Sequence, residues 1–176
     1  DAGTTTVTIN AGLKRVGPHH APQYNLLVGM DLFEFTGAAF GPLKDHVLGG
    51  VPKGCVTCHM NDGFGDLTGH SMSMTYDWHG AENFHWSATC TACHTPDGAL
   101  DLDDVFAAVT GEIDLLLDDL YDLLVASGIM YPVDDPDEYL MAPGVWTTAL
   151  TAAHVNYNAI REDRSHGFHN PAYVEA

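Results

Sequence analysis

The chain has 176 residues, 45% of them hydrophobic and 17% charged, a composition that suits one globular domain with its own core. Its 24 acidic and 6 basic residues give a formal net charge of −18, which excludes nucleic acid as a partner because the phosphates would be repelled. No apolar run approaches the roughly 20 residues needed to cross a bilayer, so we expect no transmembrane segment. Asp outnumbers Glu by 18 to 6, a surplus that would suit a saline habitat or bound calcium, which prefers hard oxygen ligands.

The first two regions of the chain show little regular periodicity. Residues 1–54 are rich in Gly, Thr and Pro and are predicted to form a loop-rich arm, in which Thr5, Val7 and Ile9 alternate as in a short strand. Residues 55–100 are dense in Gly, His, Met and aromatic residues and have neither a helical nor a strand period. We therefore expect cofactors to organise this second region.

The third region, residues 101–176, is predicted to be helical. Over 102–124 apolar residues recur at intervals of three and four, and most acidic residues fall off that stripe. A second helical pattern covers 145–164, and Asn170-Pro171 is typical of the cap and first turn of a last helix. The predicted fold class is thus mainly α with extensive irregular loops, in a single domain of residues 1–176.

Two motifs in the second region carry the chemistry, Cys55-Val56-Thr57-Cys58-His59 and Cys90-Thr91-Ala92-Cys93-His94. In each, the two thiols can form thioethers to the vinyl groups of one porphyrin, while the adjacent imidazole ligates the iron. The motifs therefore predict two covalently attached haem c groups, with His59 and His94 on the irons. Attachment of this kind takes place after export, and the start at Asp1 without a leader suggests a mature form, so we expect a periplasmic, cell-surface or extracellular protein.

Other uses of the four cysteines explain less of the pattern. A zinc site could use two Cys-x-x-Cys pairs, but the 31 residues between the pairs exceed the usual spacing of a zinc ribbon. A redox dithiol or two disulfides would leave the histidine after each pair unexplained. Haem is the interpretation that uses all six residues.

The second axial ligand of each iron must come from another histidine or from a nearby methionine, Met60, Met72 or Met74. His169 is favoured because Asn170-Pro171 would start a helix and so fix the backbone that carries the ring. A single histidine is more often a surface or supporting residue than a ligand. The nine candidates are His19, His20, His46, His70, His79, His85, His154, His166 and His169.

Several segments resemble multihaem c-type cytochromes. Their order resembles the last two haems of pentahaem nitrite reductases and related hydroxylamine-oxidoreductase-type cytochromes: an upstream His, Cys-x-x-Cys-His-Met, an intervening His, Cys-x-x-Cys-His, long helices, then His-x-Pro. The three further haems of those enzymes and their lysine-ligated active haem have no counterpart here. The segments are Val16-Gly-Pro-His-His-Ala-Pro-Gln23, Cys55-Val-Thr-Cys-His-Met60, Gly69-His70 and Asp163-Arg-Ser-His-Gly-Phe-His-Asn-Pro-Ala-Tyr173.

The resemblance implies a dihaem fold of the multihaem-cytochrome type and a set of axial pairs. Carried over by position, it pairs His59 with distal His169 on the first haem. It pairs His94 with distal His46 on the second haem. Both irons would then be bis-histidine and low-spin.

Two further histidines in these segments have no assigned iron. His70 would serve a haem that this chain lacks, so it replaces His46, has no iron, or binds a haem of a neighbouring subunit. His20, beside His19, matches the family motif but also suits a polar loop residue near a haem propionate. This surplus of ligand-like histidines motivates a cytochrome wire, in which identical subunits continue the haem chain as a homopolymer.

The axial ligands decide between the classes of function. If both irons hold two imidazoles, neither has an open position for a substrate and only the oxidation state of the haems can change. We therefore expect electron transfer and not catalysis, with redox proteins or identical subunits as partners. The alternative is a small multihaem reductase or oxidase with one open haem position, and a haem-based sensor would need the same opening.

Overall fold

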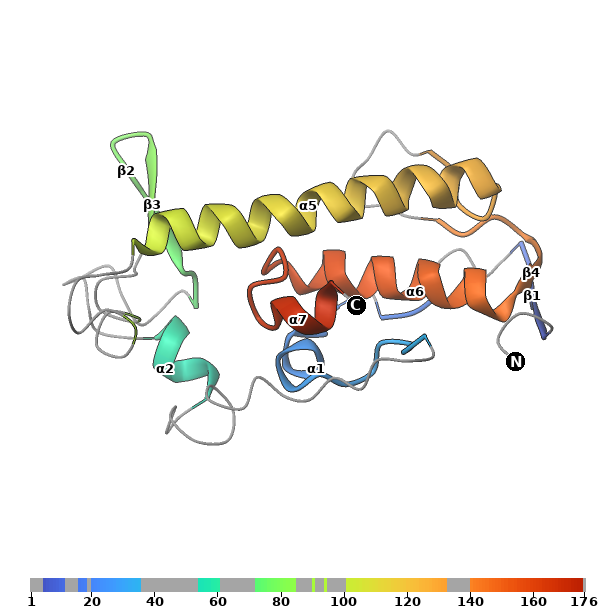
Figure 1. The fold of residues 1–176 in the computed structure, drawn as a ribbon, viewed down its shortest axis with the longest axis horizontal. Helices are drawn as coiled ribbons and strands as arrows, with labels where there is room; N and C mark the ends of the chain where they lie inside the picture. Colours follow the sequence, from blue (N-terminus) through green and yellow to red (C-terminus); the bar gives the residue numbers. More distant parts are fainter. Residues whose placement is uncertain are drawn as a thin grey trace. The chain divides into compact units, whose positions relative to one another are not determined.

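The computed structural model describes residues 5–11, 16–18, 20–35, 54–60, 72–84, 90, 94, 101–132 and 140–175. Contacts divide the chain into two compact units. Unit 1 contains residues 1–43 and 108–176, and unit 2 contains residues 44–107. The described elements are mainly helical with two small two-stranded sheets, which confirms the mainly α class (Figure 1). A single domain over 1–176, with the parts 1–54, 55–100 and 101–176, stays a prediction.

One small sheet joins the two segments of unit 1. Strand β1, Thr6–Ile9, pairs antiparallel with β4, Gly144–Thr147, so the predicted N-terminal strand is confirmed. The prediction of helix from residue 145 is wrong for its first three positions. The Thr147 side chain accepts a hydrogen bond from the Leu150 backbone N–H at 3.2 Å and caps the helix, so the residues before it remain extended.

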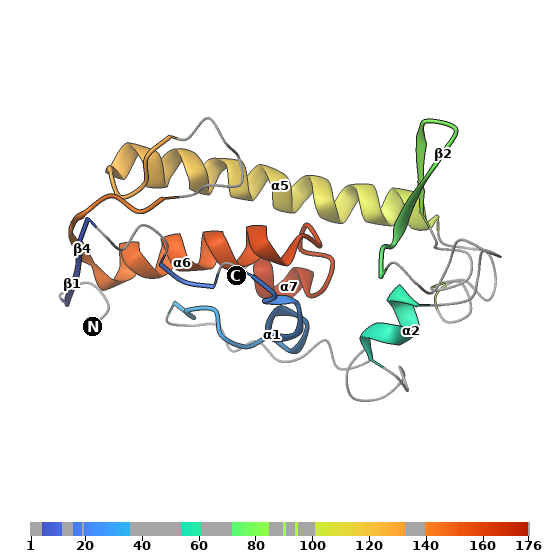
Figure 2. The same ribbon diagram turned by 180° about the vertical axis from the view of Figure 1, so that it is seen from behind.

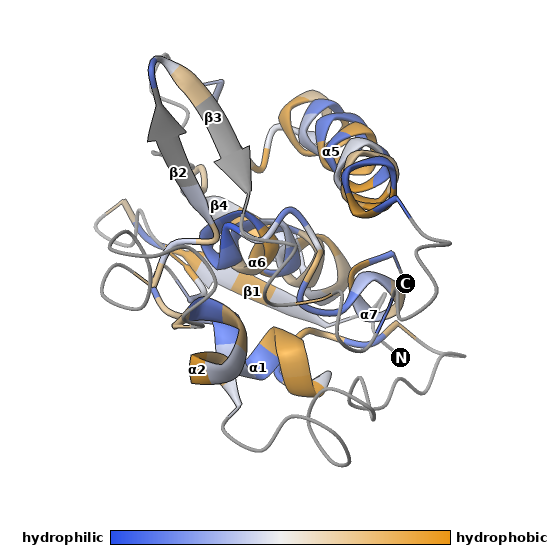
Figure 3. Ribbon diagram, turned by 90° about the vertical axis from the view of Figure 1, so that its left-hand side faces the viewer, coloured by the Kyte–Doolittle hydropathy of each residue, from blue (hydrophilic) through white to orange (hydrophobic). Residues whose placement is uncertain are grey.

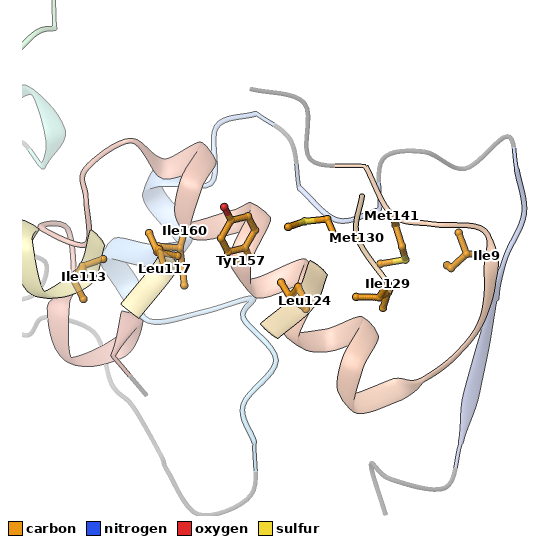
Figure 4. Close-up of a cluster of buried hydrophobic side chains, with 9 residues drawn as sticks. All are labelled: Ile9, Ile113, Leu117, Leu124, Ile129, Met130, Met141, Tyr157 and Ile160. Carbon is orange, nitrogen blue, oxygen red and sulfur yellow. The ribbon is translucent and has the colours of Figure 1, made fainter. Parts of the chain in front are cut away.

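Two helices pack side by side in unit 1. Helix α5, Leu102–Ser127, confirms the helix predicted over 102–124, and α6, Thr148–Asp163, lies beside its unit 1 portion (Figures 1 and 2). The rings of Tyr121 and Tyr157 are 6.2 Å apart between centroids. No helix among the described residues is long and apolar enough to cross a membrane. The buried side chains of the core are Ile9, Ile113, Leu117, Leu124, Ile129, Met130, Met141, Tyr157 and Ile160 (Figure 4).

The N-terminal segment covers the other side of α6, which lies between α5 and α1, Gln23–Val28 (Figure 3). The Gln23 Nε2 donates to the backbone carbonyls of Glu162 and Asp163, both at 3.2 Å. Because the last carbonyls of a helix have no partner within it, Gln23 satisfies the C-terminal end of α6. The segment thereby stabilises the point where the chain leaves α6.

The last helix, α7, Pro171–Val174, begins as predicted. The Asn170 side chain accepts a hydrogen bond from the Tyr173 backbone N–H at 3.3 Å, and Pro171 occupies the first turn. The Tyr173 hydroxyl in turn accepts a hydrogen bond from the Leu32 backbone N–H at 2.9 Å. These bonds hold the turn between α6 and α7, which contains His169, against the N-terminal segment.

Gly167 in this turn should not tolerate a side chain. Its φ is +80°, and an added Cβ would lie 2.6 Å from the Ile113 Cγ1 atom of α5, a side chain that is only 1% exposed. We expect Gly167→Ala to lower the free energy of unfolding by about 2 kcal/mol, from overpacking and the left-handed backbone together. Urea denaturation followed by circular dichroism measures this loss.

Gly111→Ala is the matched control for that substitution. Gly111 lies inside α5, and an added Cβ there has no neighbour within 4 Å among the described residues. Alanine should raise the free energy of unfolding by roughly 0.5 to 1 kcal/mol, because it lowers the entropy of the unfolded chain and favours helix. Equal losses in both variants would contradict the packing argument at Gly167.

Unit 2 contains a short helix and a hairpin. Helix α2 covers Cys55–His59, and strands β2, Thr75–Trp78, and β3, Ala81–Phe84, pair antiparallel. His79 and Gly80 form the two-residue turn with φ of 57° and 81°, the backbone that suits a tight hairpin. The prediction that 55–100 lacks a strand period missed this hairpin. Thr75–Trp78 alternates polar and aromatic residues over four positions only, and Ala81–Phe84 does not alternate.

Candidate functional site

The first Cys-x-x-Cys-His motif forms one helical turn. Cys55 and Cys58 are three positions apart in α2, so their side chains leave the same face of the helix. The Met60 backbone N–H donates to the Val56 carbonyl at 3.0 Å and continues the turn past His59. Cys55 is an exposed thiol and Cys58 is half-buried. Two thiols on one face of one turn fit two thioether bonds to a single porphyrin.

The ring of His59 has a defined orientation. Its Nδ1 lies 2.7 Å from the backbone oxygen of Met72. Because a carbonyl oxygen only accepts, this bond places the proton on Nδ1, and the neutral ring carries its lone pair on Nε2. Metal-binding histidines are held in this way, with the second nitrogen donating to a carbonyl or carboxylate. The Met72 side chain, a candidate distal ligand, is 45% exposed.

The second motif also has a backbone hydrogen bond of helical spacing. The His94 N–H donates to the Cys90 carbonyl at 2.8 Å, which is the spacing of an α-helical turn. Cys90 is half-buried and His94 is exposed. Cys93 lies outside the described residues. The described part of this motif therefore has the local geometry that α2 gives to the first.

His169 is held by a buried carboxylate. Its Nδ1 lies 2.7 Å from the Asp163 Oδ1, and its side chain is 21% exposed whereas that of Asp163 is fully buried. The Ser165 hydroxyl donates to the other carboxylate oxygen of Asp163 and accepts from the His169 backbone N–H at 3.2 Å. With Nδ1 donating to Asp163, the neutral imidazole has its lone pair on Nε2, as at His59.

Asp163 was not among the candidate haem ligands or other site residues predicted from the sequence. Its distance of six residues from His169 suggests no contact, because the two meet only after the chain reverses direction. That reversal uses three residues in the left-handed region, Arg164, His166 and Gly167, with φ of 59°, 51° and 80°. In the sequence, Asp163 falls inside the predicted helix 145–164 and Ser165 directly follows it, so the only signal was that both belong to the segment Asp163–Tyr173 that resembles multihaem cytochromes.

Of the other predicted axial ligands, only His20 lies among the described residues. His46 and His70 lie outside the described residues. His20 is exposed, with its Nδ1 3.8 Å from the Glu162 Oε2, so it lies near the same end of α6 as Asp163. His59 belongs to unit 2 and His169 to unit 1, and their pairing on one iron stays a prediction.

Two further candidate histidines, His166 and His154, differ from His169 in their burial. His166 lies on the surface, with its Nδ1 2.9 Å from the Asp114 Oδ1 of α5. His154 is completely buried in α6, where its Nδ1 faces the Asn158 amide nitrogen at 3.4 Å. Burial lowers the pKa of His154 from 6.5 to about 4, because the charged ring would lose its hydration. His154 is therefore neutral at pH 7 and packs within the helix pair.

Comparison with known proteins returned no match: no protein-family model, no curated protein and no solved structure matches this chain. Among the described residues, no three His, Cys, Asp or Glu side chains form a group that could hold a metal ion.

Proposed function

We propose that this chain is an electron-transfer protein of the multihaem c-type class, with two covalently attached haems. The observation that carries the proposal is the pair of Cys-x-x-Cys-His motifs, each with an α-helical backbone hydrogen bond across it. Cys55 and Cys58 share one face of a turn, and the Nδ1 of His59 is engaged with a carbonyl. This arrangement fits covalent attachment with Nε2 as the iron ligand.

Bound haem would supply one-electron chemistry at its iron. The residues that would hold the two groups are Cys55, Cys58 and His59, and Cys90, Cys93 and His94. The role of the chain is to bury the groups, hold the ligating rings in one tautomer and exclude water. Asp163 would hold the ring of His169 in one tautomer, through the hydrogen bond of 2.7 Å to Nδ1. With two imidazoles on each iron, no position remains for a substrate.

The location and the partners follow from the same proposal. A protein with covalent haem acts outside the cytoplasm, in the periplasm, at the cell surface or beyond it. Its redox partners would carry positive charge, since the chain has a formal net charge of −18. The wire version needs contacts between identical subunits, and the repulsion between copies makes such contacts depend on screening by salt. Exposed His20 is the described residue that favours this version.

The axial ligands are tested by spectroscopy of the purified holoprotein. Two bis-histidine haems should give only low-spin absorption and electron paramagnetic resonance (EPR) signals, and the reduced protein should not bind carbon monoxide. His169→Ala should convert one of the two haems, half of the total, to a high-spin form that binds carbon monoxide. A high-spin fraction in the unaltered protein would favour the reductase, oxidase or sensor alternative.

His166→Ala is the control for this substitution. It lies three residues from His169 in the same turn, and it bonds exposed Asp114. We expect both haems of this variant to remain low-spin. If His166→Ala and His169→Ala changed the spectrum equally, the effect would come from disturbing the turn and not from removing a ligand.

A further inference from the structure

Asp163 occupies a position where a carboxylate destabilises the fold. It is the last residue of α6, and its side chain is fully buried. The C-terminal end of a helix carries partial negative charge, so a carboxylate there is disfavoured, and burial raises the cost unless the charge is compensated. Its partners among the described residues are the Ser165 hydroxyl and the His169 imidazole, and neither is a permanent cation. An acid in this place points to a task at His169 and not to stability.

We propose that Asp163 orients the axial ligand His169 and lowers the reduction potential of the haem that His169 serves; this inference rests on the proposed function. The carboxylate accepts the hydrogen bond from Nδ1 at 2.7 Å, which fixes the ring and keeps the lone pair on Nε2. The same bond makes Nε2 a more basic ligand. A more basic ligand stabilises ferric iron more than ferrous iron, so the reduced form becomes less favourable.

Ser165 adjusts the strength of that effect. Its hydroxyl donates to the second oxygen of the Asp163 carboxylate, and this draws negative charge away from the oxygen that faces His169. Removing the hydroxyl leaves more charge for the bond to His169. Substitutions at Asp163 and at Ser165 should therefore move the potential in opposite directions, whereas a loss of packing in the turn would not.

The test is a potentiometric titration of the holoprotein and its variants, with EPR spectra of the ferric haems as a second measurement. Asp163→Asn keeps the shape but weakens the acceptor. At a fixed applied potential it should raise the reduced-to-oxidised ratio of one haem about tenfold, which is 59 mV for a one-electron couple. Ser165→Ala should lower the same ratio about twofold. The reduction potential of the other haem should not change by more than the error of the measurement, and the EPR g values of only one haem should change.

Asp114→Asn is the matched control, since it removes the same charge from another histidine–carboxylate pair, His166 and Asp114, 2.9 Å apart on the surface. It should change the reduced-to-oxidised ratio of either haem by less than twofold.

If His169→Ala leaves both haems low-spin, the ligand assignment in the proposed function fails. If His169→Ala creates a high-spin haem while Asp163→Asn and Ser165→Ala leave both potentials unchanged, the ligand stands and the role of Asp163 is refuted. Should Asp163→Asn not fold, the sign of the Ser165→Ala shift decides the matter.

Discussion

Replacement of Cys55 and Cys58 by serine should halve the covalent haem content, from two groups per chain to one. The two thiols lie on one face of α2 and, in the proposed function, would supply both thioether bonds of the first site, so the variant would have no cysteine there to retain a porphyrin. The second motif has its own cysteines, Cys90 and Cys93, and should keep its haem. Intact mass after denaturation and the pyridine haemochrome spectrum both count covalent haem.

Thr57→Ala is the control within the same turn. It changes a side chain between the two cysteines and leaves both thiols and His59 in place. We expect its haem content to equal that of the unaltered chain. If the double serine variant kept two covalent haems, or the unaltered chain carried none, the proposed cofactor would be wrong. A mass increase of one zinc ion under native conditions would instead support the zinc alternative.

Acid should destabilise unit 1 through His154. In the unfolded chain this histidine binds a proton near pH 6.5, whereas in the folded protein burial lowers its pKa to about 4. Between these values the unfolded state holds the additional proton, so the stability contributed by neutral His154 is complete above pH 6.5 and is lost as the pH falls towards 4. The loss amounts to about 3 kcal/mol, because one pKa unit corresponds to about 1.4 kcal/mol.

The comparison of His154→Leu with the unaltered chain isolates this loss from the titration of the many carboxylates. Free energies of unfolding are measured in urea at several values between pH 4 and pH 7. The difference between the two proteins should change by about 3 kcal/mol across this range, with the unaltered chain losing more. Parallel curves for His154→Leu and the unaltered chain would exclude His154 as the source.

The parts of the fold that were predicted correctly depend on local or periodic signals. The apolar stripe over 102–124 gave α5, and the Asn170-Pro171 pair gave the start of α7. The error at 145–147 has a long-range cause, because those residues pair with β1 at the other end of the chain. Local pattern favours helix there, and the pairing with a distant strand overrides it.

The candidate site also has a part that local sequence predicts and a part that depends on contacts between distant segments. The roles of Cys55, Cys58 and His59 were predicted from the order of residue types in a five-residue motif, but the helical turn that contains them was not, because five residues are too few to show a helical period. The distal side depends on contacts between distant segments, and no spacing rule predicts them. Asp163 reaches His169 only because non-glycine residues, Arg164 and His166, adopt positive φ in the turn between them. Positive φ is uncommon for non-glycine residues, so Gly167 is the one residue of this turn whose type favours such a conformation, and Arg164 and His166 do not predict it.

The pairing of β1 with β4 has a consequence for the order in which the chain can fold. Thr6 pairs with Thr147, so the first strand lacks its β4 partner until residues 144–147 have been synthesised. Unit 2 is continuous, from 44 to 107, whereas unit 1 needs both ends of the chain. Contacts between residues so far apart in sequence form late, because closing a long loop costs entropy before the contact contributes. Both cysteine motifs are thus synthesised while unit 1 is still incomplete, so the proposed haems would be able to attach before α6 and α7 pack.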